Sequence, residues 1–274
     1  LNTGEVGFLA AGTDTAVKEP SQTHTSSTPE TLYVNSYDGK ERSVSCNDHW
    51  RFYLRELNGA EAVSYNDSSW DDVTLPHDYS IDQGFSTAAP AEQESGYVPG
   101  GTGWYRKSFT LDESMQGKTV SIDFDGVYMN AAVYLNGEKL GTHPYGYTPF
   151  SFVLPQDKLK FGSEENVITV KVDHKQPSSR WYSGSGIYRD VKLTVADPVH
   201  VANYGTTVTT PDIESGKGTV SVVTEGQKDS SEAADVSVKQ TVYEKGSDVP
   251  AAEGEKTKVQ SVAAGKTARI EDSV

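Results

Sequence analysis

The chain has 274 residues, which is enough for one large β domain with a sizeable core and a second, smaller domain. Its formal net charge of −15 argues against nucleic acid or an anionic membrane surface as a partner, because both repel an acidic protein. The single cysteine, Cys46, allows no intrachain disulfide and has no companion ligands at zinc spacing. We expect no metal and no cofactor. We also expect no membrane span, since no apolar run is long enough to cross a bilayer.

Residues 1–30 are rich in Thr, Ser, Ala and Gly and poor in large hydrophobic side chains. Such a segment cannot bury enough apolar surface to order itself, so it is predicted to be a flexible tail. It lacks the basic start and apolar run of a signal peptide. Its composition is nevertheless typical of the mature start of an exported bacterial protein, and we expect a secreted or cell-surface location.

Alternating apolar and polar residues predict an all-β domain over residues 31–197. Asn136-Gly137 lies between two extended runs and predicts a β-hairpin, because both turn positions require positive φ. No long helical period occurs before Pro198. Strands are expected at residues 31–37, 41–46, 50–54, 104–109, 119–124, 131–135, 150–154, 166–172 and 187–195.

Residues 198–274 differ in composition, being poor in aromatic residues and rich in Thr, Val, Lys and Glu. Regularly spaced strand-like runs with turn residues between them are typical of an immunoglobulin-like sandwich. They fall short of the roughly seven strands of that fold, so we interpret this part as an incomplete sandwich cut from a larger polypeptide. The runs are 201–209, 219–224, 236–243, 257–262 and 267–272.

The segment RWYSGSGIYRDV, which begins at Arg180, is the leading candidate for a binding surface. Arg180, Trp181 and Tyr182 provide flat rings beside hydrogen-bond donors, which is the chemistry that a sugar ring requires. The glycines that follow permit positive φ and close approach of other groups. An aromatic loop that merely closes one end of the sandwich is an equally open alternative.

Other loops could join this surface. Tyr97 lies in a long Gly-rich and Pro-rich loop, residues 80–103, and loops of this length are usually functional or mobile. Tyr128 and Asn130 follow a predicted strand, so a strand-end ring and a turn amide are the alternatives for them. The substrate-binding candidates are Arg180, Trp181, Tyr182, Tyr97 and Asn130.

No catalytic residue is predicted in this chain. A glycosidase needs two carboxylates at a fixed separation. Asp123 and Asp125 share one face of a strand, but a solvent-facing edge explains them more simply. His77 beside Asp78 is better interpreted as a structural histidine and a turn aspartate than as a catalytic pair. No Ser/His/Asp set and no metal-ligand spacing stands out.

Five segments carry a resemblance to a known family: WRFYL, NDSSWDDVTLPHDYSI, GGTGWYRKSF, FDGVYMNAAVYLNGEKLGTHPYGYTPF and SRWYSGSGIYRDVKL. In this order, from about Trp50 to Val195, the chain resembles glycoside hydrolase family 2, most of all its large secreted bacterial β-galactosidases. Residues 199–274 are similar more weakly, by position, to the immunoglobulin-like domain of the family.

The resemblance implies a jelly-roll sugar-binding domain that packs against a downstream (β/α)8 barrel, which carries both catalytic glutamates. It implies a retaining β-galactosidase as the parent enzyme, with this chain inactive alone and its loops on the rim of the active site. Arg180 matches the position whose side chain reaches the terminal sugar, and in part of the family this position holds an acidic residue. Tyr97 matches a second rim contact. A β-glucuronidase, whose carboxylated sugar would pair with Arg180, and a stand-alone carbohydrate-binding module or adhesin are the alternatives.

Overall fold

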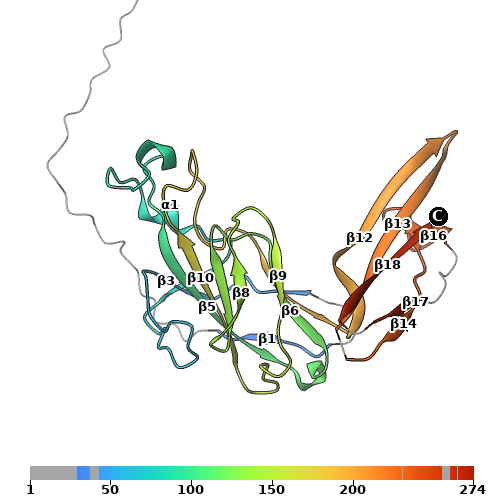
Figure 1. The fold of residues 1–274 in the computed structure, drawn as a ribbon, viewed down its shortest axis with the longest axis horizontal. Coiled ribbons are helices and arrows are strands. Elements are labelled where there is room, and N and C mark those ends of the chain that lie inside the picture. Colours follow the sequence, from blue (N-terminus) through green and yellow to red (C-terminus); the bar gives the residue numbers. More distant parts are fainter. Residues whose placement is uncertain (1–29, 38–42, 230, 255–259, 264) are drawn as a thin grey trace, which may run out of the picture.

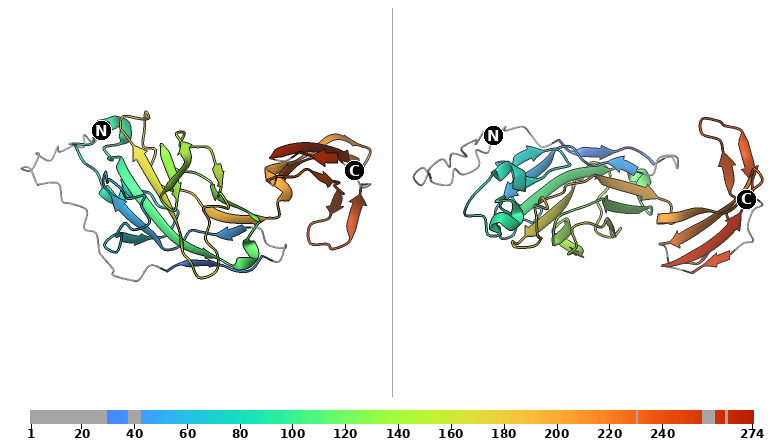
Figure 2. Two further views of the ribbon diagram at one scale, coloured as in Figure 1. Left: turned by 60° about the horizontal axis from the view of Figure 1, so that its bottom comes forward. Right: turned by 90° about the horizontal axis from the view of Figure 1, so that it is seen from above.

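The structure is a computed structural model that describes residues 30–37, 43–229, 231–254, 260–263 and 265–274. It contains two β units in chain order, which lie side by side in every view (Figures 1 and 2). The predicted tail, residues 1–30, falls outside the described residues except for Glu30. The all-β fold class is confirmed.

The N-terminal unit is a sandwich of two sheets. Within the described residues, the larger sheet has the order β4-β3-β5-β10-β7-β8, with β1 pairing parallel to β5, and the smaller sheet has the order β2-β11-β6-β9. The larger sheet comprises β1 (Leu32–Val34), β3 (Trp50–Leu54), β4 (Asp71–Val73), β5 (Gly101–Leu111), β7 (Ala131–Leu135), β8 (Glu138–His143) and β10 (Asn166–His174). The smaller sheet comprises β2 (Ser43–Ser45), β6 (Thr119–Phe124), β9 (Phe150–Val153) and β11 (Val191–Ala196).

Strand alternation explains where the core lies. In β6, Val120, Ile122 and Phe124 are wholly buried, whereas Ser121 and Asp123 face outward from the sandwich. Burying one such apolar side chain contributes about 1.5–3 kcal/mol. The same pattern leaves the outer face of the smaller sheet polar.

The hairpin between β7 and β8 forms as the sequence predicts. Asn136 and Gly137 have φ of 50° and 88°, the left-handed values that Asn-Gly tolerates. The Asn136 side chain also accepts a hydrogen bond from the backbone N–H of Val167, at 2.8 Å, and so ties the turn to the neighbouring strand β10.

The prediction of one long loop over residues 80–103 is corrected by the structure, because part of this segment is helical. The helix depends on a cap from a residue next to it. Helix α1 (Tyr79–Gln83) begins where the Asp78 side chain accepts the N–H of Ser80 at 3.0 Å, and it ends at Gly84 with φ 71°. A short 3₁₀ turn, η1 (Glu92–Ser95), follows, and β5 already begins at Gly101. A second 3₁₀ turn, η2 (Glu113–Met115), follows β5. Among the described helices none is long and apolar enough to span a membrane.

The C-terminal unit has a three-stranded sheet of order β12-β13-β18 and two small two-stranded sheets, β14-β17 and β15-β16, within the described residues. Its strands are β12 (Val199–Glu214), β13 (Lys217–Lys228), β14 (Ala234–Val236), β15 (Thr241–Tyr243), β16 (Pro250–Glu253), β17 (Gln260–Val262) and β18 (Lys266–Ser273).

The prediction of a single strand over residues 236–243 is therefore wrong. This segment contains the end of β14 and the whole of β15, which belong to different sheets, and the chain between them crosses from one sheet to the other. Gln240, in this crossing, donates its side-chain N–H to the Thr224 hydroxyl at 3.3 Å, and its carbonyl accepts from Gly254 N–H at 2.9 Å.

Candidate functional site

Several loops meet at the end of the N-terminal sandwich that carries α1 (Figure 1). Backbone hydrogen bonds join the segment around α1 to the segment that contains Ser185 and Ile187, through His77 N–H to Ile187 O at 2.8 Å and Tyr79 N–H to Ser185 O at 3.0 Å. Gly186 pairs with Tyr128 through two reciprocal bonds of 2.9 Å. These bonds give the base of the RWYSGSG segment a fixed position.

Glycines are required at two places in this base. Gly186 has φ 113°, and a Cβ there would overlap the Tyr105 hydroxyl and lie 2.8 Å from the His77 carbonyl oxygen. Gly184 has φ 73°, and a Cβ there would lie 2.9 Å from Asp78 Oδ2. The expected role of these glycines, positive φ together with close approach of other groups, is confirmed.

The Asp78 carboxylate holds the two segments together. Its Oδ1 accepts the N–H groups of Ser80, at 3.0 Å, and Ser185, at 2.8 Å, and its Oδ2 accepts the Tyr182 hydroxyl. Burial, together with the hydrogen bond to Asp78, raises the pKa of the Tyr182 hydroxyl well above its usual value. The hydroxyl of Tyr182 is thus engaged inside the protein, and only part of its ring is available to a ligand.

A buried histidine completes the base. His174 is 3% exposed, and its ring nitrogens bond to the hydroxyls of Ser185 and, at 2.8 Å, Ser178. Ser185 also bonds to the Ser80 hydroxyl at 2.5 Å. Burial lowers the pKa of the His174 imidazole below its ordinary value. Ser185 is completely buried, so this Ser–His contact is not an accessible nucleophile and base.

Above this base, three of the sequence-predicted site residues face solvent. Trp181 is 67% exposed and Tyr97 is 41% exposed. Arg180 is also exposed, and its guanidinium forms no hydrogen bond or ion pair with any residue that the structure describes. A flat indole and a free cation are therefore presented next to each other in the chain.

Asn130 and Tyr128 are placed differently. The Asn130 side-chain amide donates to the Asp173 carbonyl at 3.0 Å within a turn of φ 50°, so its nitrogen is occupied. For Tyr128 the structure agrees with the strand-end alternative: its ring is 3% exposed, and a Cβ on Gly146 would overlap it. Tyr145 and Tyr147, which are 58% and 49% exposed, present rings on this side instead. Their tyrosine-rich loop was the signal that sequence reasoning passed over.

An open cavity of about 440 Å³ lies among these loops, between the start of β5 and the end of β10. The Thr102 hydroxyl and the Lys175 ammonium bind the Asp173 carboxylate on its wall, at 3.2 Å each. Gln176, also on the wall, has a buried side-chain oxygen with no partner in the described part of the chain. No group of three His, Cys, Asp or Glu residues within the described ranges could hold a metal ion.

The profile described as "Glycosyl hydrolases family 2, sugar binding domain" matches residues 36–197. The chain belongs to glycoside hydrolase family 2.

Individual relatives agree with the family. The chain is 45% identical over 186 residues to the β-galactosidase BoGH2A of Bacteroides ovatus, covering 68% of this chain and 22% of that protein. It is 41% identical over 177 residues to a putative β-glucuronidase of Formosa agariphila, covering 64% of this chain and 17% of that protein. A crystal structure of a family 2 member from Bacteroides cellulosilyticus superposes with a TM-score of 0.78 at 33% identity, covering 85% of this chain and 30% of that one.

The chain thus spans only about a fifth of the length of these two curated family 2 relatives. Relatives named as β-galactosidases and as β-glucuronidases both match it, so family membership alone leaves the sugar open.

Proposed function

We propose that this chain is the N-terminal, non-catalytic portion of a retaining β-galactosidase that acts on terminal β-D-galactosides, and that its loops form part of the rim of the active site. The observation that carries the proposal is the exposed Arg180–Trp181 pair on a loop whose base is fixed by Asp78 and His174. The 45% identity to a β-galactosidase supports the choice of sugar. A secreted or cell-surface location is part of the proposal and is supported by the composition of the opening residues.

The chemistry of bond cleavage would belong to a downstream (β/α)8 barrel. In a retaining mechanism one carboxylate forms a glycosyl-enzyme intermediate while the other donates a proton to the leaving group and then accepts a proton from the water that hydrolyses the intermediate. The rim would contribute positioning: the Trp181 ring offers an apolar face, and Arg180 offers up to five N–H donors in a fixed fork. A rim whose base is already ordered loses less conformational entropy when it binds substrate, so more of the binding energy remains for orientation.

A β-glucuronidase is the second candidate, and one observation favours it. The Arg180 guanidinium has no carboxylate partner among the described residues, and a glucuronate carboxylate would pair with it in bidentate fashion. The relative from Formosa agariphila that is named a putative β-glucuronidase is in line with this alternative.

Steady-state kinetics of the intact enzyme test the proposal with two substrates, 4-nitrophenyl β-D-galactopyranoside and 4-nitrophenyl β-D-glucuronide. The galactoside should be the better substrate. Arg180→Ala should lower kcat/KM for it by about 10- to 200-fold, the usual effect of losing one substrate contact worth about 1–3 kcal/mol.

Arg269→Ala is the matched control, because it removes an exposed arginine from the separate C-terminal unit. It should leave kcat/KM unchanged. A preference for the glucuronide would replace the first candidate with the second. An Arg180→Ala enzyme as active as the parent on both substrates would refute the rim role.

A further inference from the structure

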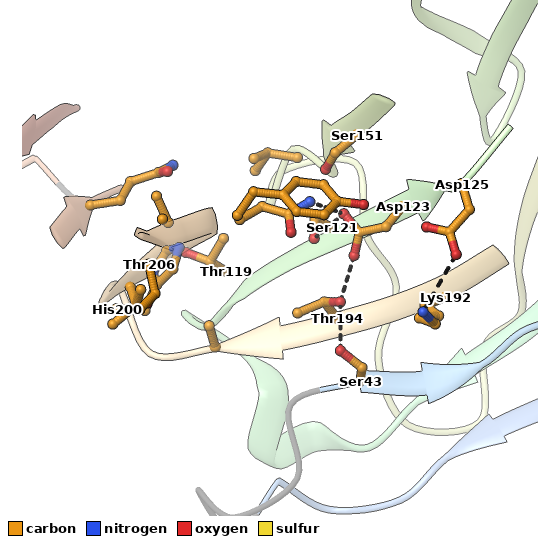
Figure 3. Close-up of a pocket in the computed structure, with 18 residues that line it drawn as sticks. Ser43, Thr119, Ser121, Asp123, Asp125, Ser151, Lys192, Thr194, His200 and Thr206 are labelled. Atoms are coloured by element: carbon orange, nitrogen blue, oxygen red, sulfur yellow. Dashed lines mark hydrogen bonds and ion pairs between the residues drawn. The ribbon is translucent and has the colours of Figure 1, made fainter. Parts of the chain in front are cut away.

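A second cavity, of about 500 Å³, lies against the smaller sheet and the start of β12 (Figure 3). Its floor is the outer face of the smaller sheet, and its wall is the first part of β12, where the two units meet. None of its lining residues comes from the loops that present Tyr97, Arg180 and Trp181. We call this cavity the interdomain groove.

The floor of the interdomain groove is an ordered polar array. Asp123 Oδ2 accepts the Thr194 hydroxyl at 2.5 Å, and Thr194 is bonded in turn to Ser43 at 3.0 Å. Next to them Asp125 Oδ2 lies 3.5 Å from the Lys192 ammonium (Figure 3). Asp123 Oδ1 accepts from both Ser121 and Asn203 and is fully used, but each carboxylate oxygen has two lone pairs, and Asp123 Oδ2 and the Asp125 carboxylate keep free acceptor capacity beside the Lys192 donor.

The wall of the groove is formed by an irregularity in β12. Val201 pairs with Gly226 and Thr206 with Thr224, so residues 202–205 of β12 lie opposite the single residue Glu225 of β13. Bulges of this kind redirect side chains and are frequent next to functional sites.

At the tip of the bulge Tyr204 has φ 54° and is 73% exposed while it lines the groove. A bulky residue at positive φ is an outlier that the surrounding structure must hold in place. The Asn203 side chain donates to Asp123 Oδ1 at 3.1 Å and so anchors the bulge to the floor of the groove. Gly205 provides the room that the bulge needs, because a Cβ there would lie 2.7 Å from the Ala202 carbonyl oxygen.

We propose that the interdomain groove is a second glycan-binding site, which takes a neutral oligosaccharide. An exposed aromatic ring over fixed hydroxyls, carboxylates and one ammonium matches a ligand that has apolar ring faces and many hydroxyls. The two floor carboxylates outnumber the one lysine, which disfavours uronates and other anions. In the intact enzyme such a site would hold a polysaccharide while a distant chain end is cleaved, and it would not depend on which terminal sugar is removed.

Affinity electrophoresis of the intact protein tests this site. Native gels would contain β-1,4-galactan, xylan or polygalacturonate, and retardation would be measured for the parent protein and for Tyr204→Ala, Tyr204→Phe and Lys192→Met. At least one neutral polysaccharide should retard the parent. Tyr204→Ala should weaken that binding by about tenfold, whereas Tyr204→Phe, which keeps the ring, should stay within about twofold. Lys192→Met should also weaken binding. If Tyr204→Ala does not fold, Lys192→Met tests the groove in its place.

Tyr243→Ala, which removes another exposed tyrosine from the same unit, is the control and should bind as the parent does. All variants should keep the parent's kcat/KM on whichever 4-nitrophenyl glycoside it cleaves, and this separates the groove from the rim. Absence of retardation by both neutral polysaccharides, retardation by polygalacturonate alone, or unchanged binding in the variants would overturn the proposal.

Discussion

Asp78 illustrates how one short carboxylate can organise a site without taking part in chemistry. It caps α1 and holds the Ser185 N–H, and it also accepts the Tyr182 hydroxyl. Its neighbour His77 points elsewhere: its Nδ1 bonds to the Tyr105 hydroxyl at 2.7 Å. The two side chains therefore serve separate structural contacts, in agreement with their interpretation as a structural histidine and a turn aspartate.

Stability should fall in mild acid because of two histidines: His174, which is buried, and His77, which is largely buried. Burial lowers the pKa of both His77 and His174 below the ordinary value of 6.5, although Asp82 near His77, and Asp78 and Asp173 near His174, partly oppose this. The unfolded chain then binds more protons than the folded one just below pH 6.5. The stabilising contribution is complete above that pH and is lost as the pH falls toward the folded pKa values. Thermal unfolding between pH 7.5 and 5 should show the decrease, at most about 1.4 kcal/mol per pH unit for each histidine.

The matched variant for this prediction is His174→Gln, which keeps a donor and an acceptor but does not titrate. It should be less stable than the parent at pH 7.5, and its stability should fall less steeply as the pH is lowered. An unchanged slope would mean that His174 is not responsible for the pH dependence.

At the scale of elements, the sequence predicts strands well where one face is buried. The expected bounds of β6 and β7 agree with the structure, because alternation and the Asn-Gly turn are local signals. It fails where one particular side-chain contact, rather than a periodic pattern, decides the outcome. Helix α1 is only five residues long and depends on the Asp78 cap, and the break within residues 236–243 depends on contacts of Gln240.

In the candidate site, the sequence predicts which side chains are exposed but not which ones are buried or already paired. Exposure of Arg180 and Trp181 follows from a polar, glycine-flanked loop, and the sequence indicates it. Burial of Tyr128 and the pairing of His174 with Ser185 are tertiary facts, because they require Gly146 and the segment around α1 to close over these side chains. Which donors are already occupied, as in Asn130, is equally invisible before the fold is known.

Gly186→Ala should be severely destabilising, because it adds a steric clash to backbone strain. The new Cβ would overlap the hydroxyl of fully buried Tyr105 at a residue with φ 113°. We expect a loss of about 2–4 kcal/mol in the free energy of unfolding. Gly59→Ala is the control: its φ is 75° but nothing lies within 4 Å of the new Cβ, so only the conformational cost of about 1 kcal/mol should appear. Equal losses in the two variants, measured by urea denaturation, would contradict the argument.

At the scale of the whole molecule, the two units have separate cores of very different size. Among the described residues, the buried members of the main hydrophobic cluster all lie between Val34 and Val195. In the C-terminal unit the buried apolar side chains among the described residues are Val222, Val262 and Ile270. Polar contacts join the units, including Thr119 Oγ1 to Asp229 Oδ2 at 2.9 Å. Such contacts fix an orientation but contribute little to stability compared with a core.

Residues 1–197 should therefore fold without the C-terminal unit. The truncation leaves the main cluster intact and removes the polar bonds between the units, including those of Thr119 and Asp123, so we expect a loss of about 1–3 kcal/mol and a cooperative unfolding transition. Residues 198–274 alone should show no cooperative transition, because their buried apolar surface is too small to offset the entropy of ordering the chain. Calorimetry of both pieces checks this. A truncated N-terminal unit without a cooperative transition would show that the C-terminal strands support the sandwich and are more than a separate unit attached to it.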